Sequence, residues 1–146
     1  MPVIKLKEIA EALDESMDEW EQFINIKTGK IISVPESPWT AGQDIYDELN
    51  AELEEAEDDF RMLPNQYEIR EYNIMMDFAL ESGNDVVEAK LTRELHRTHP
   101  YRHFKDAIYD MGIEQLYYDY RFKAYLEKAR EWCESHGLEY EEKMIL

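Results

Sequence analysis

Apolar residues recur at three- and four-residue steps over most of the chain, which is the spacing of amphipathic helices. The first such stripe runs from Leu6 to Met17. Further stripes cover residues 43–60, 65–82, 85–95, 100–112 and 114–132. We therefore predict about six helices.

Residue types that begin helices divide these stripes. Asn65 with Glu68, and Asp85 with Glu88, have the spacing of a capping box, in which each residue's side chain accepts a hydrogen bond from the other's backbone N–H. The helix predicted over 65–82 is apolar on nearly every side. A helix of that kind is normally buried, so we expect the other helices to pack around it at the centre of the fold.

One segment has the two-residue period of a β-strand. Trp20, Ile24 and Ile26 occupy alternate positions, and the turn sequence KTGK (27–30) supplies a glycine where a tight turn needs positive φ. Pro35 closes a second strand. We predict a β-hairpin over about 20–35, and with the helices this indicates an α+β, mainly α, fold.

The last helix is predicted to end in a Schellman motif, with Gly137 in the left-handed conformation and Leu138 as the apolar residue that follows. The segment 138–146 is then predicted to fray, unless its three terminal apolar residues dock. No repeat and no low-complexity linker divides the chain, so residues 1–146 are predicted to form a single domain.

The composition limits the classes of function. The chain has 34 acidic against 16 basic residues, a formal charge of −18, and this field repels nucleic acid and anionic membranes. A hydrophobic content of 44% is enough for a packed core. One cysteine excludes an internal disulfide, no apolar segment reaches the roughly 20 residues of a membrane span, and the N-terminus has no signal-peptide pattern. We expect a cytoplasmic protein without direct nucleic-acid or membrane binding.

Against this acidic background the stretch RELHRTHPYRHFKD (93–106) gathers four Lys/Arg and three of the four His. With Pro100 in the first turn of a helix, cationic side chains follow where the helix dipole is positive, at a cost of a few tenths of a kcal/mol each. A bound anion would compensate them. The residues of this anion-binding hypothesis are Arg97, His99, Arg102, His103 and Lys105. The alternative is that carboxylates of neighbouring helices pair with these bases.

His96, His99 and His103 have the spacing of one helical face, but the residue before Pro100 avoids the α conformation. The three imidazoles are therefore not expected to share a helix, and we predict neither a metal site nor a cofactor.

The run QDIYDELNAELEEAEDDF (43–60) holds nine carboxylates and no base. Such a run is typical of a solvated helix face, and it can also form a partner-binding surface. The residues of this second hypothesis are Glu54, Glu55, Asp58 and Asp59.

Aromatic residues are concentrated in the last helix. Tyr118, Phe122 and Tyr125 have the spacing of a packing stripe, whereas Tyr117 and Tyr120 lie off it and are candidates for an exposed aromatic patch. None of the serines lies in a nucleophile-elbow pattern, Cys133 lies on the apolar side of this helix, and no carboxylate pair is singled out. The pattern names no catalytic residue and favours a non-enzymatic protein, without deciding the point.

Several motifs taken together resemble the uncharacterised bacterial protein family numbered 0158. They are the KTGK turn, Leu63–Pro64, the final helix ending in EW, and an aromatic-Arg-x-Phe-Lys-Asp group at Tyr101, Arg102, Phe104, Lys105 and Asp106. The chain departs from that pattern at His103, where a second Arg is usual, and at Leu116, where a Trp is usual. The resemblance implies a compact, mainly helical fold with a small β element and no established activity.

These observations predict an acidic protein that binds a partner or regulates it without catalysis. The alternative is a small protein that binds, or processes, an anion or a phosphate ester at the basic helix start over 99–106.

Overall fold

The protein is described by a computed structural model over residues 2–142. Its contacts divide the chain into two compact units. Unit 1 comprises Met1–Ile69 and Tyr125–Leu146, and unit 2 comprises Arg70–Ala124. The α+β, mainly α, class is confirmed, and the six helices of nine residues or more in the described chain match the predicted number.

Unit 1 contains the predicted hairpin. Strands β1 (Trp20–Asn25) and β2 (Ile31–Pro35) pair antiparallel, with Phe23 opposite Ile32. A third strand, β3 (Phe60–Met62), pairs antiparallel with the other edge of β1 and gives the order β2-β1-β3. The prediction of a helix up to Phe60 missed this strand.

The hairpin turn depends on Gly29. The Asn25 side chain accepts hydrogen bonds from the backbone N–H groups of Lys27 and Thr28, at 2.8 and 3.1 Å, and this bends the chain. Gly29 follows with φ +80°, and a Cβ placed on it would lie 2.4 Å from the carbonyl oxygen of Val3. The position therefore requires glycine for both its backbone conformation and its surroundings.

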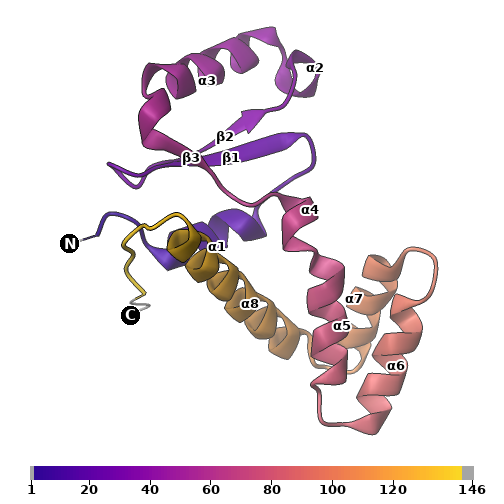
Figure 1. Ribbon diagram of the computed structural model, residues 1–146. Coiled ribbons are helices and arrows are strands. Elements are labelled where there is room, and N and C mark those ends of the chain that lie inside the picture. The colour runs from indigo at the N-terminus through magenta and orange to yellow at the C-terminus, as the bar shows by residue number, and fades with distance from the viewer. Residues whose placement is uncertain (1, 143–146) are drawn as a thin grey trace. The chain divides into compact units, whose positions relative to one another are not determined.

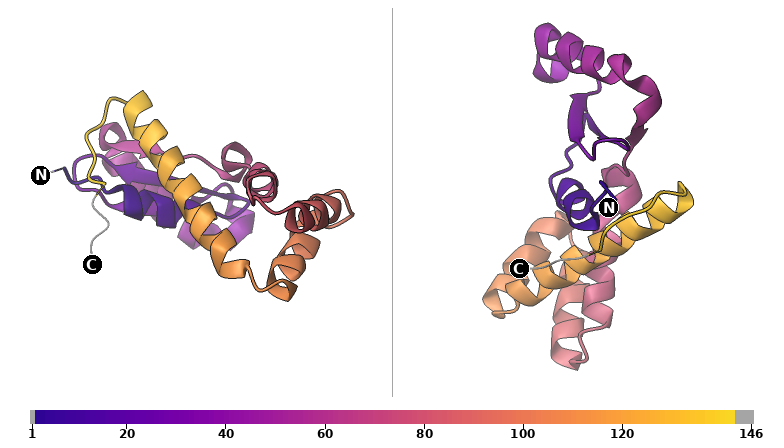
Figure 2. Two further views of the ribbon diagram at one scale, coloured as in Figure 1. Left: turned by 90° about the horizontal axis from the view of Figure 1, so that it is seen from below. Right: turned by 90° about the vertical axis from the view of Figure 1, so that its left-hand side faces the viewer.

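Helices cover both faces of this sheet (Figures 1 and 2). Helix α1 (Leu6–Asp14) lies on one face, and α2 (Pro38–Ala41) and α3 (Gln43–Glu55) lie on the other. A 3₁₀ turn, η1 (Glu57–Asp59), then leads into β3. The cluster between sheet and α3 consists of Ile32, Val34 and Phe60 with Phe23, Leu49, Leu53 and Ala56.

The predicted helix over 65–82 is two helices. Its capping box is present, because Asn65 Oδ1 accepts from the Glu68 N–H at 2.9 Å and Glu68 Oε1 accepts from the Asn65 N–H at 3.3 Å. Helix α4 (Gln66–Ile69) nevertheless ends at Arg70, which has φ +53°, and α5 (Glu71–Leu80) begins after it. This break is also the boundary between the units, so the prediction of one central helix is wrong.

Unit 2 is helical throughout. It consists of α5, α6 (Asp85–Leu95), α7 (Pro100–Asp110) and the first part of α8 (Glu114–Ser135). Helix α6 is capped by Asn84 and not by the predicted Asp85, because Asn84 Oδ1 accepts from the Val86 and Val87 N–H groups. The core of unit 2 includes Met75, Phe78, Leu91, Leu95, Phe104, Ile108 and Tyr117.

Helix α8 continues from unit 2 into unit 1. The predicted packing stripe is confirmed in unit 1, where Tyr125 is buried, but in unit 2 the buried stripe is displaced from the predicted one. Tyr117, placed off the stripe by its spacing, is fully buried in unit 2, while Tyr118 is only half-buried. Arg121, one turn after Tyr117, lies on the same face. Because this residue is charged, the spacing of apolar residues alone could not identify the buried face. In unit 1, Tyr125, Ala129 and Cys133 continue the same face.

The C-terminal Schellman motif is confirmed, since the Leu138 N–H donates to the Cys133 carbonyl at 2.9 Å and Gly137 has φ +64°. Beyond it, Glu141 pairs with the N-terminal segment. Its N–H donates to the Ile4 carbonyl at 2.8 Å, and its carbonyl accepts from the Leu6 N–H at 3.0 Å. Part of the segment predicted to fray is thus hydrogen-bonded, and residues 143–146 lie outside the described residues. None of the described helices is long and apolar enough to cross a membrane.

Candidate functional site

The basic segment lies at the end of α6 and the start of α7, as its sequence predicts. His99 precedes α7 with φ +57°, so the residue before Pro100 avoids the right-handed helical region. Among residues 2–142 no side-chain hydrogen bond caps the N-terminus of α7. His96 follows the last residue of α6, so the three histidines do not share one helix.

Arg102 is exposed and Lys105 is half-buried on the first turns of α7. Within residues 2–142 neither side chain forms a hydrogen bond or an ion pair. The carboxylate partners expected under the alternative hypothesis are therefore absent for these two bases in the described part of the chain.

Arg97 does have a carboxylate partner. Its Nη1 lies 2.7 Å from Glu94 Oε2, and Lys90 Nζ lies 3.1 Å from Glu94 Oε1. Glu94 is only 4% exposed, although it is on a charged helix. The hydrogen bonds from Arg97 and Lys90 hold the pKa of Glu94 below its ordinary value, against the opposing effect of burial. Arg97 is thus ion-paired with a buried carboxylate, as the alternative hypothesis expected.

Two of the five residues of the anion-binding hypothesis line one pocket in the described part of the chain. A shallow depression of about 130 Å³ is lined by His103 and Arg97 but not by Arg102, Lys105 or His99. Its other lining residues are Lys90, Glu94, Asp106, Ala107 and Asp110. Three carboxylates in that lining oppose an anion there. The part of the chain that the structure describes holds no group of three or more His, Cys, Asp or Glu side chains suited to a metal ion.

The four residues of the partner-binding hypothesis lie where α3 ends and η1 follows. We call Glu54, Glu55, Asp58 and Asp59 the α3 acidic cluster. The first three are exposed and Asp59 is half-buried. Within residues 2–142 none of the four forms an ion pair, whereas Glu52, one turn earlier, pairs with Lys30.

Charge is divided unevenly between the units. Residues 70–124 carry eight Lys/Arg against ten Asp/Glu, a formal charge of −2. The rest of the chain carries eight against 24, a formal charge of −16. The acidity of the protein therefore belongs almost wholly to unit 1.

Unit 1 also exposes a large aromatic side chain. Trp39, on the short helix α2, is 95% exposed, and Ile45 on the first turns of α3 is exposed as well. The helical stripe predicted for 43–60 placed Ile45 against the core, and that part of the prediction is wrong. The segment 38–55 thus presents apolar residues at its start and carboxylates at its end.

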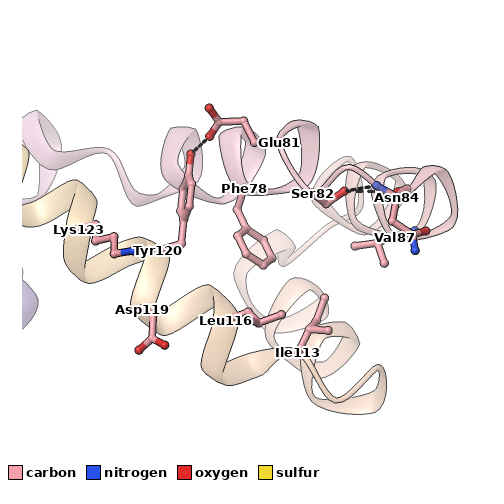
Figure 3. Close-up of a pocket in the computed structure, with 10 residues that line it drawn as sticks. All are labelled: Phe78, Glu81, Ser82, Asn84, Val87, Ile113, Leu116, Asp119, Tyr120 and Lys123. Carbon is pink, nitrogen blue, oxygen red and sulfur yellow. Dashed lines mark hydrogen bonds between the residues drawn. The ribbon is translucent and has the colours of Figure 1, made fainter.

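A pocket of about 510 Å³ within unit 2 was not predicted from the sequence (Figure 3). The end of α5, the start of α6 and the first part of α8 form it. Its apolar residues are Phe78, Val87, Ile113 and Leu116, and its polar ones are Glu81, Ser82, Asn84, Asp119, Tyr120 and Lys123. Tyr120, which lies off the predicted packing stripe, is the one signal in the sequence that pointed here.

The hydroxyl of Tyr120 on α8 donates a hydrogen bond to the carboxylate of Glu81, which follows α5 (Figure 3). Partial burial raises the pKa of Tyr120 most, and the hydrogen bond to Glu81 and the negative charges of Glu81 and Asp77 raise it further. Tyr120 therefore stays a neutral phenol. Tyr117 is buried, so the prediction of an exposed aromatic patch is wrong for Tyr117.

Comparison with known proteins bears on the family alone. No curated protein and no solved structure matches the chain. One family model, described as an uncharacterised protein family (UPF0158), matches residues 1–143.

Proposed function

The chain belongs to the uncharacterised protein family UPF0158, as its motifs indicated, and from the chemistry of its surface we propose that it binds a partner protein. In this proposal the protein is cytoplasmic and non-enzymatic, and it binds a positively charged surface of another protein through unit 1. The contact residues are the α3 acidic cluster and Trp39.

The main support is the position of the acidic cluster. Glu54 and Glu55 lie in the last turn of α3, where the helix dipole is negative and where α3 has no basic residue. Each carboxylate there costs a few tenths of a kcal/mol, and more where several like charges are close together. Within residues 2–142 no ion pair compensates this repulsion. A cationic partner would relieve it.

In this proposal Trp39, on α2, is the apolar anchor of the interface. An almost fully exposed tryptophan contributes nothing to the core, and tryptophan is among the residues enriched in the energetic centres of protein interfaces. Trp39 and the acidic cluster lie at opposite ends of α3, whose 13 residues span about 20 Å. An interface of ordinary size covers that length.

The test is an affinity purification from lysate of the source cells with quantitative mass spectrometry. We expect one or more basic proteins to be captured by the wild type and lost in two variants. One is Trp39→Ala, and the other changes Glu54, Glu55, Asp58 and Asp59 to Gln or Asn. The captured partner should dissociate as ionic strength rises, because exposed charges are screened.

A matched control changes four exposed carboxylates elsewhere in unit 1, namely Glu8, Glu11, Glu15 and Asp18, by the same total charge. It should retain the partner. If the control variant and the α3 variant lose the same proteins, net charge alone attracts them and the α3 surface is not the interface.

A second candidate function is anion binding at the start of α7. It is supported by Arg102 and Lys105, which follow an N-terminus without a side-chain cap and lack ion pairs within the described residues. Phosphate or a nucleotide should then raise the melting temperature logarithmically above its Kd, and Arg102→Ala should abolish the effect. Lys27→Ala, which removes an exposed cation in unit 1, should not. A flat melting temperature across phosphate and a nucleotide panel excludes this candidate.

A further inference from the structure

We propose that the pocket of unit 2 binds a small protonated amine with an aromatic or branched apolar body. All of its lining residues belong to Arg70–Ala124, and none belongs to the α3 acidic cluster. The site is therefore independent of the partner-binding surface proposed above.

The size and floor of the pocket suit a small organic molecule. A volume of about 510 Å³ lies within the range of ligand pockets, which are mostly apolar with a few polar groups that fix orientation. Phe78 on α5, Val87 on α6, and Ile113 and Leu116 at the start of α8 supply the apolar surface. Leu116 is 63% exposed, and it would lose that unfavourable contact with water when a ligand covers it.

The charges at the rim favour a cation. Glu81 and Asp119 are negative, and Lys123 is the single positive residue among those lining the pocket. Glu81 also directly follows the last residue of α5, where the helix dipole is negative and no basic residue lies in the last turn. Asp77, one turn earlier, adds a further negative charge near the Tyr120 hydroxyl.

Tyr120 is arranged to accept a hydrogen bond from such a cation. Its proton is directed to Glu81, which leaves the lone pairs of its hydroxyl oxygen as acceptors. The phenol stays neutral because its pKa is raised, and its ring packs edge-on against Phe78 with 5.4 Å between centroids. An ammonium group at this end would be held by Tyr120 and Glu81, with its apolar body over Phe78 and Leu116.

An anion does not fit the same place. The start of α6, which would attract an anion, already has its first N–H groups bound by Asn84 Oδ1, at 2.9 Å to Val86 and 3.1 Å to Val87. A carboxylate ligand would therefore meet two like charges and few free donors. This is why the proposal names an amine.

Three probes with one indole body test the charge of the ligand. They are tryptamine as the cation, tryptophol as the neutral alcohol and indole-3-propionate as the anion. Titrated into the 146-residue chain and followed by calorimetry, tryptamine should bind with a Kd of about 0.1–10 mM, the affinity expected for so small a ligand. Tryptophol should bind more weakly, and indole-3-propionate most weakly. Equal Kd values for the three would overturn the proposal.

Backbone NMR shifts in the wild type locate the binding, independently of any variant. Tryptamine should shift the resonances of residues that line the pocket, such as Leu116, Asp119 and Tyr120. Shifts confined to the acidic residues of unit 1, or equal binding of ethylammonium, would mean that net charge alone attracts the cation. Either result overturns the proposal.

Variants then separate the two parts of the site. Asp119→Asn and Glu81→Gln should each weaken tryptamine by about two- to five-fold, the range for partly exposed charge pairs. Leu116→Ser should weaken all three probes. Glu114→Gln, which makes the same change of charge on α8 outside the pocket, should leave the affinity unchanged. The substituted side chains are exposed, so the melting temperature should hold. If Glu114→Gln weakens tryptamine as much as Asp119→Asn does, the pocket is not the binding site.

Discussion

Arg121 on α8 and Glu71 on α5 form an ion pair, with 2.9 Å between the guanidinium Nη1 and the carboxylate Oε2. The two side chains are 16% and 21% exposed. The same carboxylate oxygen accepts a hydrogen bond from the hydroxyl of Tyr117 at 2.9 Å. The guanidinium also lies over the ring of Tyr118, 4.8 Å from its centroid. Within unit 2, Glu71 therefore connects the first turn of α5 to two turns of α8.

Replacing Glu71 with Ala should lower the free energy of unfolding by about 2–4 kcal/mol, because a mostly buried guanidinium loses its carboxylate. Urea denaturation measures the loss. The matched control is Glu131→Ala, which removes an exposed carboxylate from α8, the helix of Arg121, and should cost less than about 0.5 kcal/mol. If the two variants are equally stable, the ion pair contributes nothing.

Glu94 should make stability depend on pH in the acid range. Its folded pKa lies below the ordinary value of 4.5, so the folded chain releases this proton more readily than the unfolded chain does. The contribution is therefore present above about pH 4.5 and is lost as the pH falls through the folded pKa. Glu94→Gln should cost about 1 kcal/mol at pH 7, since its partners are partly exposed, and the cost should shrink towards pH 3. A cost that is constant over this range contradicts the assignment.

Gly29→Ala should destabilise unit 1 more than another glycine substitution does. The new methyl group would meet the Val3 carbonyl oxygen and would also sit at positive φ, so we expect a loss of about 2–4 kcal/mol. Gly42→Ala is the control, because its φ is also positive but, apart from its two chain neighbours, no described residue has an atom within 4 Å of its Cβ position. It should lose about 1 kcal/mol. Similar losses in thermal or urea unfolding would mean that strain, and not the contact with Val3, decides both.

The prediction of a single domain can be tested by comparing the two units. All three tryptophans, Trp20, Trp39 and Trp132, belong to unit 1, so their fluorescence reports that unit. Far-ultraviolet circular dichroism reports the helices of both units. Because α8 runs through both, we expect coincident unfolding transitions. Two separated transitions would mean that the units unfold independently.

The sequence predicted structure best where interacting residues are close along the chain. The hairpin with its KTGK turn, the Asn65–Glu68 capping box and the Schellman motif at Gly137 each involve residues within a few positions of one another. Their chemistry can be identified in a short window. The same local reasoning placed the start of α7 at Pro100.

Prediction failed where a distant segment decides the outcome. Strand β3 has three residues and exists because it pairs with β1. Arg70 ends α4 in a left-handed conformation although no glycine, asparagine or proline marks the position. The buried face of α8 includes Arg121, whose partner Glu71 is 50 residues away. A sequence window contains none of this information.

For the candidate sites, too, prediction succeeded where the residues are close along the chain and failed where distant segments meet. The basic and acidic clusters could be identified as unusual charge on helix ends, because both are local. The pairing of Arg97 with a buried Glu94 could not, since it depends on how deeply α6 is packed. The pocket of unit 2 needs the ends of three helices to meet, and only Tyr120 hinted at it.

Cys133 lies at the fully buried end of the stripe on α8, and burial raises the pKa of its thiol to about 11. At neutral pH the sulfur is therefore both protonated and inaccessible, so alkylating reagents can modify it only in molecules that have transiently opened. The rate of thiol labelling thus counts opening events at a single atom. The chain carries its own reporter of local unfolding, without any added dye or engineered residue.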